Sequence, residues 1–292
     1  MAVMLLALLV AVAAQAQSAA TAQACGAPAI TAAEVTLNGD VRVTGTACPG
    51  RAVELFLGKP KPATLDAPAG SLQALEAAGS SSAGDCGVFV ATLRPMTMDT
   101  QLVARVSDAG AAPIDSAPRA LTLSQWPEAV VETPEGSFVM RLFSDAAPGH
   151  VKHFVETAIA HSYDGTLFHR VLPGDLVQGG DPISRDPKKP QRYGSGGLGQ
   201  LKAEFSDRCF YRGIVGAVRC PSNCDSAGNQ FFIALKDHPE LRGQYTAFGE
   251  VVSGLDVVDL ISRKGESGQP LPRIPMTVTV RQAPDVFQAA QK

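Results

Sequence analysis

The sequence has few charged residues, few aromatic residues and no long apolar run. Asp, Glu, Lys and Arg make up 18% of the 292 residues, the net charge is −3, and aromatic residues reach only 6%. A chain without a basic excess lacks the surface charge typical of nucleic-acid-binding proteins. No apolar run reaches the roughly 18–20 residues that a membrane-spanning helix needs. These shortages exclude a nucleic-acid partner and a membrane span, although 45% apolar residues suffice for a folded core.

Motifs of several enzyme classes are missing as well. The sequence contains no G-x-S-x-G nucleophile elbow and no H-E-x-x-H zinc motif. Gly194–Gly199 fits the dinucleotide pattern G-x-G-x-x-G, but that pattern requires a preceding strand. Pro187 and Pro190 make the preceding segment unsuitable for a central strand. We therefore interpret the glycines as a flexible loop and expect no cofactor.

The N-terminus is typical of an exported protein. Residues 1–14 are uninterrupted apolar residues, and the small-residue sites Ala14-Gln15-Ala16 and Ala22-Gln23-Ala24 follow them. This order favours a signal peptide over residues 1–24, although no Lys or Arg precedes the apolar run. A buried N-terminal helix is the alternative, and lipid attachment at Cys25 is another. The signal peptide predicts a location in the bacterial periplasm or cell envelope.

Export affects how the cysteines are interpreted. An even number of cysteines in an oxidising compartment indicates disulfides. In an up-and-down order of strands, the turns that carry Cys48 and Cys86 share one end of the first domain, and this predicts a bond between them. In the second half a Cys220–Cys224 pair is slightly favoured. Their C-x3-C spacing is not one that structural zinc normally uses, so we expect no metal. The six cysteines are Cys25, Cys48, Cys86, Cys209, Cys220 and Cys224.

Residues 25–125 predict a β-sandwich. Short β-type segments recur there between turns that are rich in glycine, asparagine and proline, and Asn38-Gly39 is the strongest hairpin signal. The segment resembles bacterial immunoglobulin-like modules, with V-x-G-T-A-x-P-G-x-x-V followed by a D-x-G-x-F turn. The resemblance implies a spacer or a module that binds a partner in the cell envelope. The seven expected strands are Glu34–Leu37, Val41–Thr44, Ala52–Leu57, Ser71–Ala77, Val88–Leu93, Gln101–Val106 and Arg119–Leu123.

Residues 126–284 predict a second domain, followed by a tail over residues 285–292. A helix is expected to begin near Pro148, because apolar residues then recur at helical spacing. A second short helix is expected at Gly254–Ser262, and a final strand at Met276–Val280. His150, His153 and His161 are expected on the solvated face of the first helix. The inward positions of that helix are Val151, Phe154, Val155, Ala158 and Ile159.

Three further segments carry a specific resemblance. They are F-H-R-V-L-P-G-D-L-V-Q-G-G-D over residues 168–181, N-Q-F-F-I over 229–233, and L-R-G-Q-Y-T-A-F-G-E-V over 241–251. In this order they resemble the cyclophilin family of peptidyl-prolyl isomerases. The resemblance covers about residues 129–282. It implies a closed eight-stranded antiparallel barrel capped by two helices, and an enzyme that acts on proline-containing polypeptides.

The resemblance also implies roles for individual residues. Arg170 matches the catalytic arginine, and Gln178 matches the glutamine that binds substrate backbone. Two positions depart from the family: Asp175 stands where a phenylalanine forms one wall of the proline cup, and Glu240 stands where many members have tryptophan. The stretch before the N-Q-F-F-I segment, Val218-Arg219-Cys220, departs as well. The implied substrate-binding positions are Phe168, Leu176, Phe232, Leu241 and Tyr245, together with Asp175 and Glu240.

Three functions are compatible with these residues. The first is an exported prolyl isomerase that assists the folding of secreted proteins, and Arg170, Gln178 and Phe232 favour it. The second is a proline-peptide binding module or holdase with little turnover, and Asp175 favours it. The third is a surface-interaction protein whose function resides in the β-sandwich.

Overall fold

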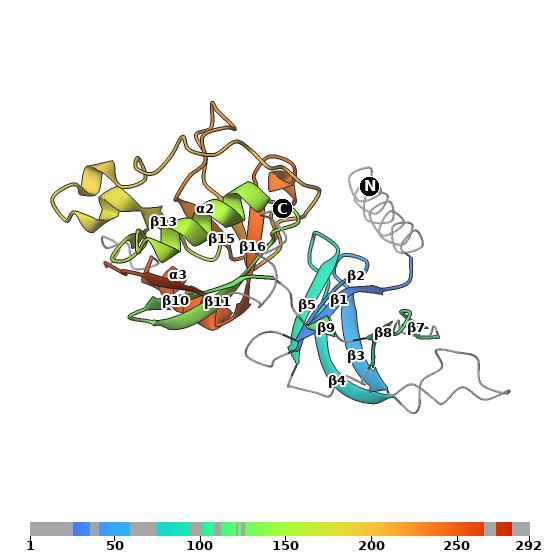
Figure 1. Cartoon of the computed structure of the whole chain (residues 1–292). Helices are drawn as coiled ribbons and strands as arrows, with labels where there is room; N and C mark the ends of the chain where they lie inside the picture. The colour runs from blue at the N-terminus through green and yellow to red at the C-terminus, as the bar shows by residue number, and fades with distance from the viewer. Residues whose placement is uncertain are drawn as a thin grey trace, which may run out of the picture. The chain divides into compact units, whose positions relative to one another are not determined.

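A computed structural model of the chain describes residues 26–35, 41–58, 75–93, 101–107, 112–120, 122–123, 126–265 and 273–281. These residues form two compact units that divide between Thr122 and Leu123, and each unit has its own sheets (Figure 1). The expected signal peptide, Cys25 and the C-terminal tail lie outside the described residues. Within the ranges given above, no helix is both long and apolar enough to cross a bilayer.

The first unit consists of two antiparallel sheets that share one core. Alternation along the strands sends Val43, Leu55, Phe89 and Leu102 into this core, which draws buried side chains from both sheets. The immunoglobulin-like assignment stays a prediction. One sheet has the order β5-β2-β1-β9, from β1 (Ala29–Val35), β2 (Val41–Thr46), β5 (Val88–Leu93) and β9 (Thr122–Leu123). The other has the order β4-β3-β6-β7, from β3 (Ala52–Gly58), β4 (Glu76–Ser82), β6 (Gln101–Val106) and β7 (Ile114–Asp115), and β8 (Arg119–Ala120) pairs with β6.

Three expectations for this unit were wrong. The strands are not in up-and-down order, because β2 pairs with β5 instead of β3. The strand expected at 71–77 shares only its last two residues with β4, whose sequence of Ala, Gly and Ser gives no strand signal, and residues 71–74 lie outside the described residues. A side chain at Gly79 of β4 would come within 2.9 Å of the end of the Leu93 side chain, so a larger residue there would have to displace Leu93. The strand expected at 119–123 is divided between β8 and β9, which belong to different sheets.

The second unit is built on one antiparallel sheet of eight strands, in the order β12-β13-β15-β14-β16-β11-β10-β17. Its concave side encloses a core rich in aromatic rings, in which Phe154, Tyr163 and Phe231 pack within 4.9–6.1 Å of one another between ring centroids. The strands are β10 (Glu128–Thr133), β11 (Gly136–Leu142), β12 (Leu167–Leu172), β13 (Leu176–Asp181), β14 (Ile214–Ala217), β15 (Phe231–Ala234), β16 (Ala247–Ser253) and β17 (Thr277–Arg281).

The expectation of a closed barrel was wrong. The strands at the two edges of the sheet are β12 and β17. Among the described residues, one isolated bridge, between Leu167 and Pro275, joins these two edges. Backbone hydrogen bonds flank this bridge, from Phe168 N to Ile274 O (3.1 Å) and from Met276 N to Thr166 O (2.9 Å). The pairing does not extend into a ladder, because β12 shifts register on both sides of Phe168. The result is an open half-barrel with a short seam.

Both predicted helices of the second unit are confirmed. Helix α2 (Pro148–Ile159) and helix α3 (Leu255–Lys264) both pack their buried side chains into the core that the sheet encloses. The predicted inward face of α2 is correct except at Ile159, which is 61% exposed in its last turn. Gly254 caps α3 with φ +75°, and a side chain there would come within 2.5 Å of the Ser137 carbonyl.

The first turn of α2 is anchored by a carboxylate. Glu204 accepts hydrogen bonds from the backbone N–H groups of Gly149 and His150 at 2.9 Å, and its Oε2 lies 2.5 Å from His150 Nδ1. A negative charge at a helix N-terminus is favourable. The prediction of a solvated His150 was wrong, because its ring is buried under the loop that carries Glu204.

The described cysteines include both disulfide-bonded and free residues. Cys48, Cys86 and Cys209 are disulfide-bonded. Cys220 and Cys224 are free thiols, so the slightly favoured Cys220–Cys224 pair was wrong. Cys224 is exposed, and its sulfur approaches the neighbouring Asp225 instead of Cys220.

The turns that hold Cys48 and Cys86 lie against each other. Backbone hydrogen bonds run from Ala47 N to Gly87 O (2.9 Å) and from Gly50 N to Ala83 O (2.7 Å). Because β2 pairs with β5 and β3 pairs with β4, the pairings Thr46–Val88 and Ala52–Ser82 bring both turns to the same place. This adjacency, and not an up-and-down order, supports the predicted Cys48–Cys86 bond.

We expect a protease digest made without reductant to contain a linked pair of peptides that carry Cys48 and Cys86. Peptides with Cys220 and Cys224 should be alkylated without reduction. Replacing both Cys48 and Cys86 by Ala should lower the free energy of unfolding of the first unit by about 2–4 kcal/mol. A Cys220→Ser, Cys224→Ser double variant is the matched control. Recovery of Cys48 and Cys86 as free thiols in the exported protein contradicts the pairing.

The stability of the second unit should fall as the pH falls. Burial lowers the pKa of His150 below its ordinary value of 6.5 and outweighs the opposing hydrogen bond and charge of Glu204. The unfolded chain therefore takes up the proton first. The stabilisation is fully present above pH 6.5 and is lost as the pH falls toward the folded pKa. Melting curves between pH 8 and 5 should show this loss.

The single tryptophan gives a readout for this unit alone, because Trp126 packs edge-on against Phe143. In fluorescence melts, His150→Gln should flatten the decline of Tm with falling pH. His161→Gln removes an exposed histidine of the same region and should leave the slope unchanged. An unchanged slope in His150→Gln shows that this histidine is not the titrating group.

Candidate functional site

Four adjacent strands of the second unit carry one row of residues on the convex side of the sheet. Arg170 of β12 pairs with Gln178 of β13, Gln178 pairs with Phe232 of β15, and Phe232 pairs with Gly216 of β14. Directly opposed residues of antiparallel strands project from the same face. The register therefore brings Arg170, Gln178 and Phe232, all predicted site residues, side by side.

The neighbouring row fixes which face this is. Val171, Val177, Ile233 and Val215 pair across the same four strands, one position along from the first row. Val177, Ile233 and Val215 are fully buried in the core, and Val171 packs against it. Since side chains alternate between the faces of a strand, the Arg170 row faces away from the core.

Phe168 does not join the site. Strict alternation puts Phe168 on the same face as Arg170, two residues away, but β12 shifts register between them: Phe168 pairs with Gly179, and Arg170 pairs with Gln178. This bulge reverses the face on which the side chain lies. The Phe168 ring is 1% exposed and packs on Phe138 and Phe231 in the core, so it is not available to a substrate.

A chain of neutral amides holds Arg170 in place. Arg170 Nη1 donates to Gln178 Oε1 (3.1 Å), and Gln178 Nε2 donates to Gln230 Oε1 (3.0 Å). Gln230 Nε2 in turn donates to the carbonyls of Gly194 (2.9 Å) and Gly196 (2.7 Å). Both glutamines are buried, whereas the guanidinium is exposed. The chain fixes which way each amide points, with oxygens toward the arginine.

Gln230 was not among the predicted site residues. Its signal was present in the sequence, because Gln230 directly precedes Phe231 and Phe232 in the N-Q-F-F-I segment. The glycine loop that accepts its hydrogen bonds is a loop, as predicted, with the short turns η1 (Pro182–Arg185) and η2 (Pro190–Arg192) before it. Asp181 anchors the loop by accepting from Gly194 N.

Aromatic rings pack around Phe232, at the position that corresponds to the expected proline cup. A side chain on Gly216 would come within 2.3 Å of the Phe232 ring, so the ring occupies space that only glycine leaves open. Phe210 stacks on Phe232 at 5.7 Å between centroids, and Tyr245 meets it edge-on at 5.7 Å. The sequence identified Phe232 and Tyr245 but missed Phe210, which has no motif around it.

The two leucines border the same region. Leu176 precedes Gln178 by two residues on β13 and so shares its face, and Leu176 pairs with Ala234 on β15. Leu241 ends the short turn η3 (Pro239–Leu241), and its carbonyl accepts from Tyr245 N (3.1 Å). Both side chains are half-buried. Among the described residues, no group of three or more His, Cys, Asp or Glu is placed to hold a metal ion.

Comparison with known proteins identifies the family. The family described as cyclophilin type peptidyl-prolyl cis-trans isomerase/CLD matches residues 129–281. The chain belongs to this family. A probable peptidyl-prolyl cis-trans isomerase of Brucella suis is 41% identical over 143 residues, which are 47% of this chain and 72% of that protein. A peptidyl-prolyl cis-trans isomerase of Arabidopsis thaliana is 31% identical over 163 residues, which are 53% of this chain and 96% of that protein.

Among solved structures, a Cryptosporidium parvum cyclophilin matches with a TM-score of 0.48 and 23% identity, over 55% of this chain and 99% of that chain. The family match and the sequence relatives identify the second unit as a cyclophilin domain, and its enzyme class is that of the peptidyl-prolyl isomerases.

The two departures from the family lie together at one edge of the cyclophilin domain's cup. Asp175 Oδ1 lies 2.5 Å from Lys236 Nζ and 3.5 Å from His238 Nε2. Glu240 Oε1 lies 2.8 Å from His238 Nδ1, and this hydrogen bond lowers the pKa of Glu240. The buried imidazole of His238 therefore lies between the two carboxylates. These four residues form the ionic edge of the cup.

The Asp175 carboxylate does not pair with the guanidinium of Arg170. Asp175 follows Gly174, whose φ of +67° turns the chain between β12 and β13, and its carbonyl accepts from Leu235 N (2.8 Å). The Asp175 carboxylate consequently lies beside the end of β15 and pairs with Lys236 there. Among the described residues, Gln178 is the one whose side chain accepts a hydrogen bond from Arg170.

His169 lies beside the amide chain, in surroundings that favour its uncharged form. Its Nε2 lies 3.4 Å from Gln178 Nε2, and its Nδ1 lies 3.3 Å from the Leu167 carbonyl. Burial is the main cause that lowers the pKa of His169, and the charge of Arg170 acts in the same direction. A neutral imidazole adds no repulsion next to the guanidinium, so Arg170 is the positive charge of this row.

Proposed function

We propose that the cyclophilin domain catalyses rotation about X-Pro amides in exported polypeptides, with Arg170 as its catalytic residue. The observation that carries the proposal is the row of Arg170, Gln178 and Phe232, which sets a fixed guanidinium beside an apolar cup. The membership of the family supports the reaction, and the site geometry supports the assignment of roles.

The chemistry requires a hydrogen-bond donor and no nucleophile. Amide resonance sets a rotation barrier of about 18–20 kcal/mol, and the twisted amide loses that resonance. Its nitrogen then becomes a better hydrogen-bond acceptor. The Arg170 guanidinium offers several donors and stays protonated at working pH. Because this bond is stronger to the twisted amide than to the planar one, it lowers the barrier instead of merely binding the substrate.

The remaining residues bind and position. The rings of Phe232 and Tyr245 suit a proline ring, which is apolar and compact, and the fully buried Phe210 supports Phe232 from behind. Gln178 lies between the arginine and the cup, so its amide suits the substrate backbone next to proline. Gln230 is a positioning residue, because it fixes the Gln178 amide from behind. Leu176 and Leu241 extend the apolar border.

Export is supported by two independent features. Residues 1–24 have the apolar run and small-residue sites of a signal peptide. Cys48, Cys86 and Cys209 are disulfide-bonded, which is typical of oxidising compartments. We propose the bacterial periplasm or cell envelope as the location and secreted polypeptides as substrates. A cell-envelope partner of the first unit stays a prediction.

The second candidate function is a proline-peptide binding module with little turnover. The observation that favours it is the ionic edge of Asp175, Lys236, His238 and Glu240, which replaces apolar wall on one side of the cup. A protease-coupled assay on a short X-Pro peptide separates the two functions. Turnover supports the isomerase, and binding without turnover supports the module.

Arg170→Ala should lower kcat/KM on X-Pro peptides by about 10²–10³-fold, the usual effect of removing one donor to a transition state. The guanidinium is exposed, so circular dichroism and melting curves should stay as in the wild type. Arg170→Lys keeps the charge but not the planar set of donors, and it should recover only part of the activity. Wild-type turnover in Arg170→Ala contradicts the proposed mechanism.

Asp175→Phe should raise kcat/KM by up to about tenfold, since about 1.5 kcal/mol of apolar contact with the proline ring corresponds to that factor. Asp175→Asn is the matched control, because it removes the charge without adding a wall. It should leave turnover near that of the wild type, given that the carboxylate pairs with Lys236 and not with Arg170. Equal gains in both variants show that the charge, and not the missing wall, limits turnover.

A further inference from the structure

A second guanidinium, that of Arg219, lies close to the aromatic rings of the cup. Arg219 follows β14, and its Cζ lies 4.6 Å from the centre of the Tyr245 ring. Tyr245 in turn meets Phe232 edge-on at 5.7 Å. One aromatic ring therefore separates the Arg219 charge from the ring that forms the base of the cup.

The Arg219 side chain is half-buried and held in one orientation. Its Nε donates to Gln244 O (2.9 Å), and its Nη1 donates to the carbonyls of Cys220 (3.2 Å) and Pro221 (3.3 Å). The loop itself is anchored by the bond from Cys220 N to Ser226 Oγ (2.7 Å). A side chain that is already ordered loses little conformational entropy when a ligand binds.

All the acceptors of this guanidinium are neutral carbonyls. Within the described ranges, no carboxylate forms an ion pair with Arg219, and Nη2 makes no hydrogen bond. Arg170 is similar, because its acceptor is the neutral oxygen of Gln178. Two positive charges on the border of the cup thus have no negative partner in the described part of the chain.

The carboxylates of the cup do have partners. Asp175 pairs with Lys236, and Glu240 pairs with His238, both on the ionic edge. Charges that are paired at short range contribute weak fields beyond their pair, whereas an unpaired guanidinium attracts anions directly. The charge balance therefore favours an anionic group on the Arg170 and Arg219 side.

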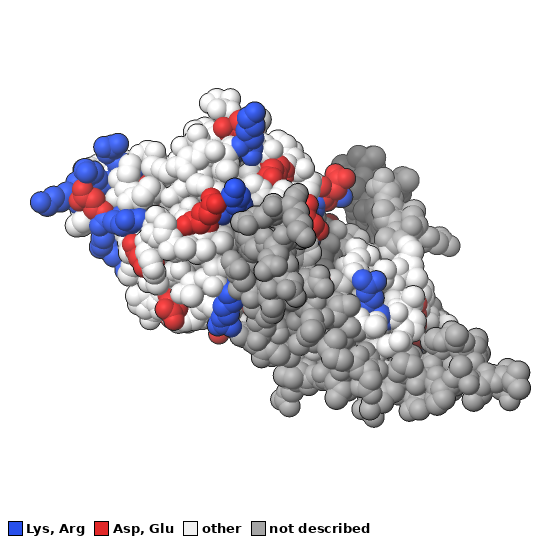
Figure 2. Space-filling model, in the orientation of Figure 1, with Lys and Arg blue, Asp and Glu red and all other residues white. Residues whose placement is uncertain are grey.

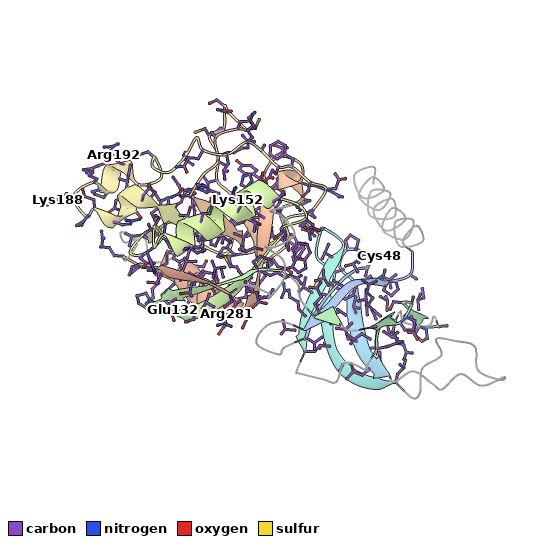
Figure 3. The ribbon with its side chains drawn as sticks, viewed as in Figure 1. Cys48, Glu132, Lys152, Lys188, Arg192 and Arg281 are labelled. Atoms are coloured by element: carbon purple, nitrogen blue, oxygen red, sulfur yellow. The ribbon has the colours of Figure 1, made fainter. Side chains whose placement is uncertain are left out.

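Arg219 differs from the exposed cations elsewhere on the domain. Lys188 and Arg192 lie at the outer end of the segment that contains η1 and η2 (Figure 3), where Lys and Arg side chains gather in the space-filling view (Figure 2). Those two side chains are exposed, and freely solvated charges bind single anions weakly. Arg219 combines a charge with burial, fixed orientation and proximity to an apolar cup.

We propose that Arg219 is a specificity-determining residue that selects substrates with Asp or Glu next to the proline. Arg219 lies on the Tyr245 ring and Tyr245 meets Phe232 edge-on, so the proposal places the carboxylate of the residue beside the proline near the Tyr245 ring and Arg219. The free Nη2 donor then gains a charge-assisted hydrogen bond. The inference rests on the proposed function, since it assumes that proline occupies the cup.

The test uses blocked peptides that differ only at the residue before or after proline, with Glu, Gln or Lys there. Exchange NMR on the full-length protein gives kcat/KM for cis–trans rotation, and shift titration of the same samples gives Kd. At one of the two positions, we expect kcat/KM of the wild type to be about tenfold higher with Glu than with Gln, and lowest with Lys. This preference should shrink at high salt.

Variants assign the preference to Arg219. In Arg219→Gln, kcat/KM should be the same on the Glu peptide and the Gln peptide. Arg219→Lys should retain part of the preference for the Glu peptide, because the charge remains. The control is Lys152→Gln on α2, which removes an equal charge from a side chain that is 71% exposed (Figure 3) and should keep the full preference. Circular dichroism confirms that each variant is folded.

The outcomes separate this inference from the proposed function. No Glu preference at either position in wild type, or an undiminished preference in Arg219→Gln, overturns the role of Arg219. Absence of turnover on every peptide overturns the isomerase function instead. In that case the Kd ratios still decide the role of Arg219, because a Glu preference in binding that Arg219→Gln removes supports the subsite without turnover.

Discussion

The site depends on one break in the alternation of strand β12. An uninterrupted strand puts Phe168 and Arg170 on the same face, which either exposes a large aromatic ring or buries a guanidinium. The bulge between them resolves this conflict, because it turns Phe168 into the core and leaves Arg170 outside. Close packing requires the glycines opposite the bulge: a side chain on Gly179 would come within 2.6 Å of Met276, and one on Gly180 within 2.7 Å of the Asn229 carbonyl.

A second property of the site is that uncharged hydrogen-bonding groups hold the catalytic arginine. Arg170 is held through Gln178 and Gln230 to backbone carbonyls, without a carboxylate in the chain. A carboxylate partner offers a stronger hydrogen bond to the arginine, but it neutralises the charge and competes for the donors that a substrate needs. Amides orient the guanidinium and leave its charge intact. The carboxylates of the cup instead meet Lys236 and His238 on the ionic edge.

Sequence patterns predicted the elements that local periodicity determines. Both helices of the second unit follow from apolar spacing, and Gly254 marks the start of the second one. Arg170, Gln178 and Phe232 followed from motifs, and the sheet register brings them into one row. The sequence did not predict on which face Phe168 lies, because a bulge depends on the partner strand and leaves no trace in the spacing of one strand.

The other contacts that the sequence did not predict join residues that are distant in the chain. Asp175 pairs with Lys236 and His150 pairs with Glu204, and neither partner is identifiable before the fold is known. Phe210 has no motif around it, so its place beside the cup follows only from stacking on Phe232. In the first unit, β4 consists largely of small residues that carry no strand propensity, and it forms a strand through its pairing with β3.

The seam of the half-barrel has a consequence for how other chains approach the domain. Unpaired sheet edges invite a strand from a second molecule, and this is a common route to aggregation. At the bridge, Pro275 has no N–H to offer, and the N–H of Leu167 is already taken by Ser184 Oγ at 2.8 Å. Strand addition at the Leu167–Pro275 bridge therefore lacks main-chain donors from both residues, so the seam resists intermolecular β-pairing without a closed barrel.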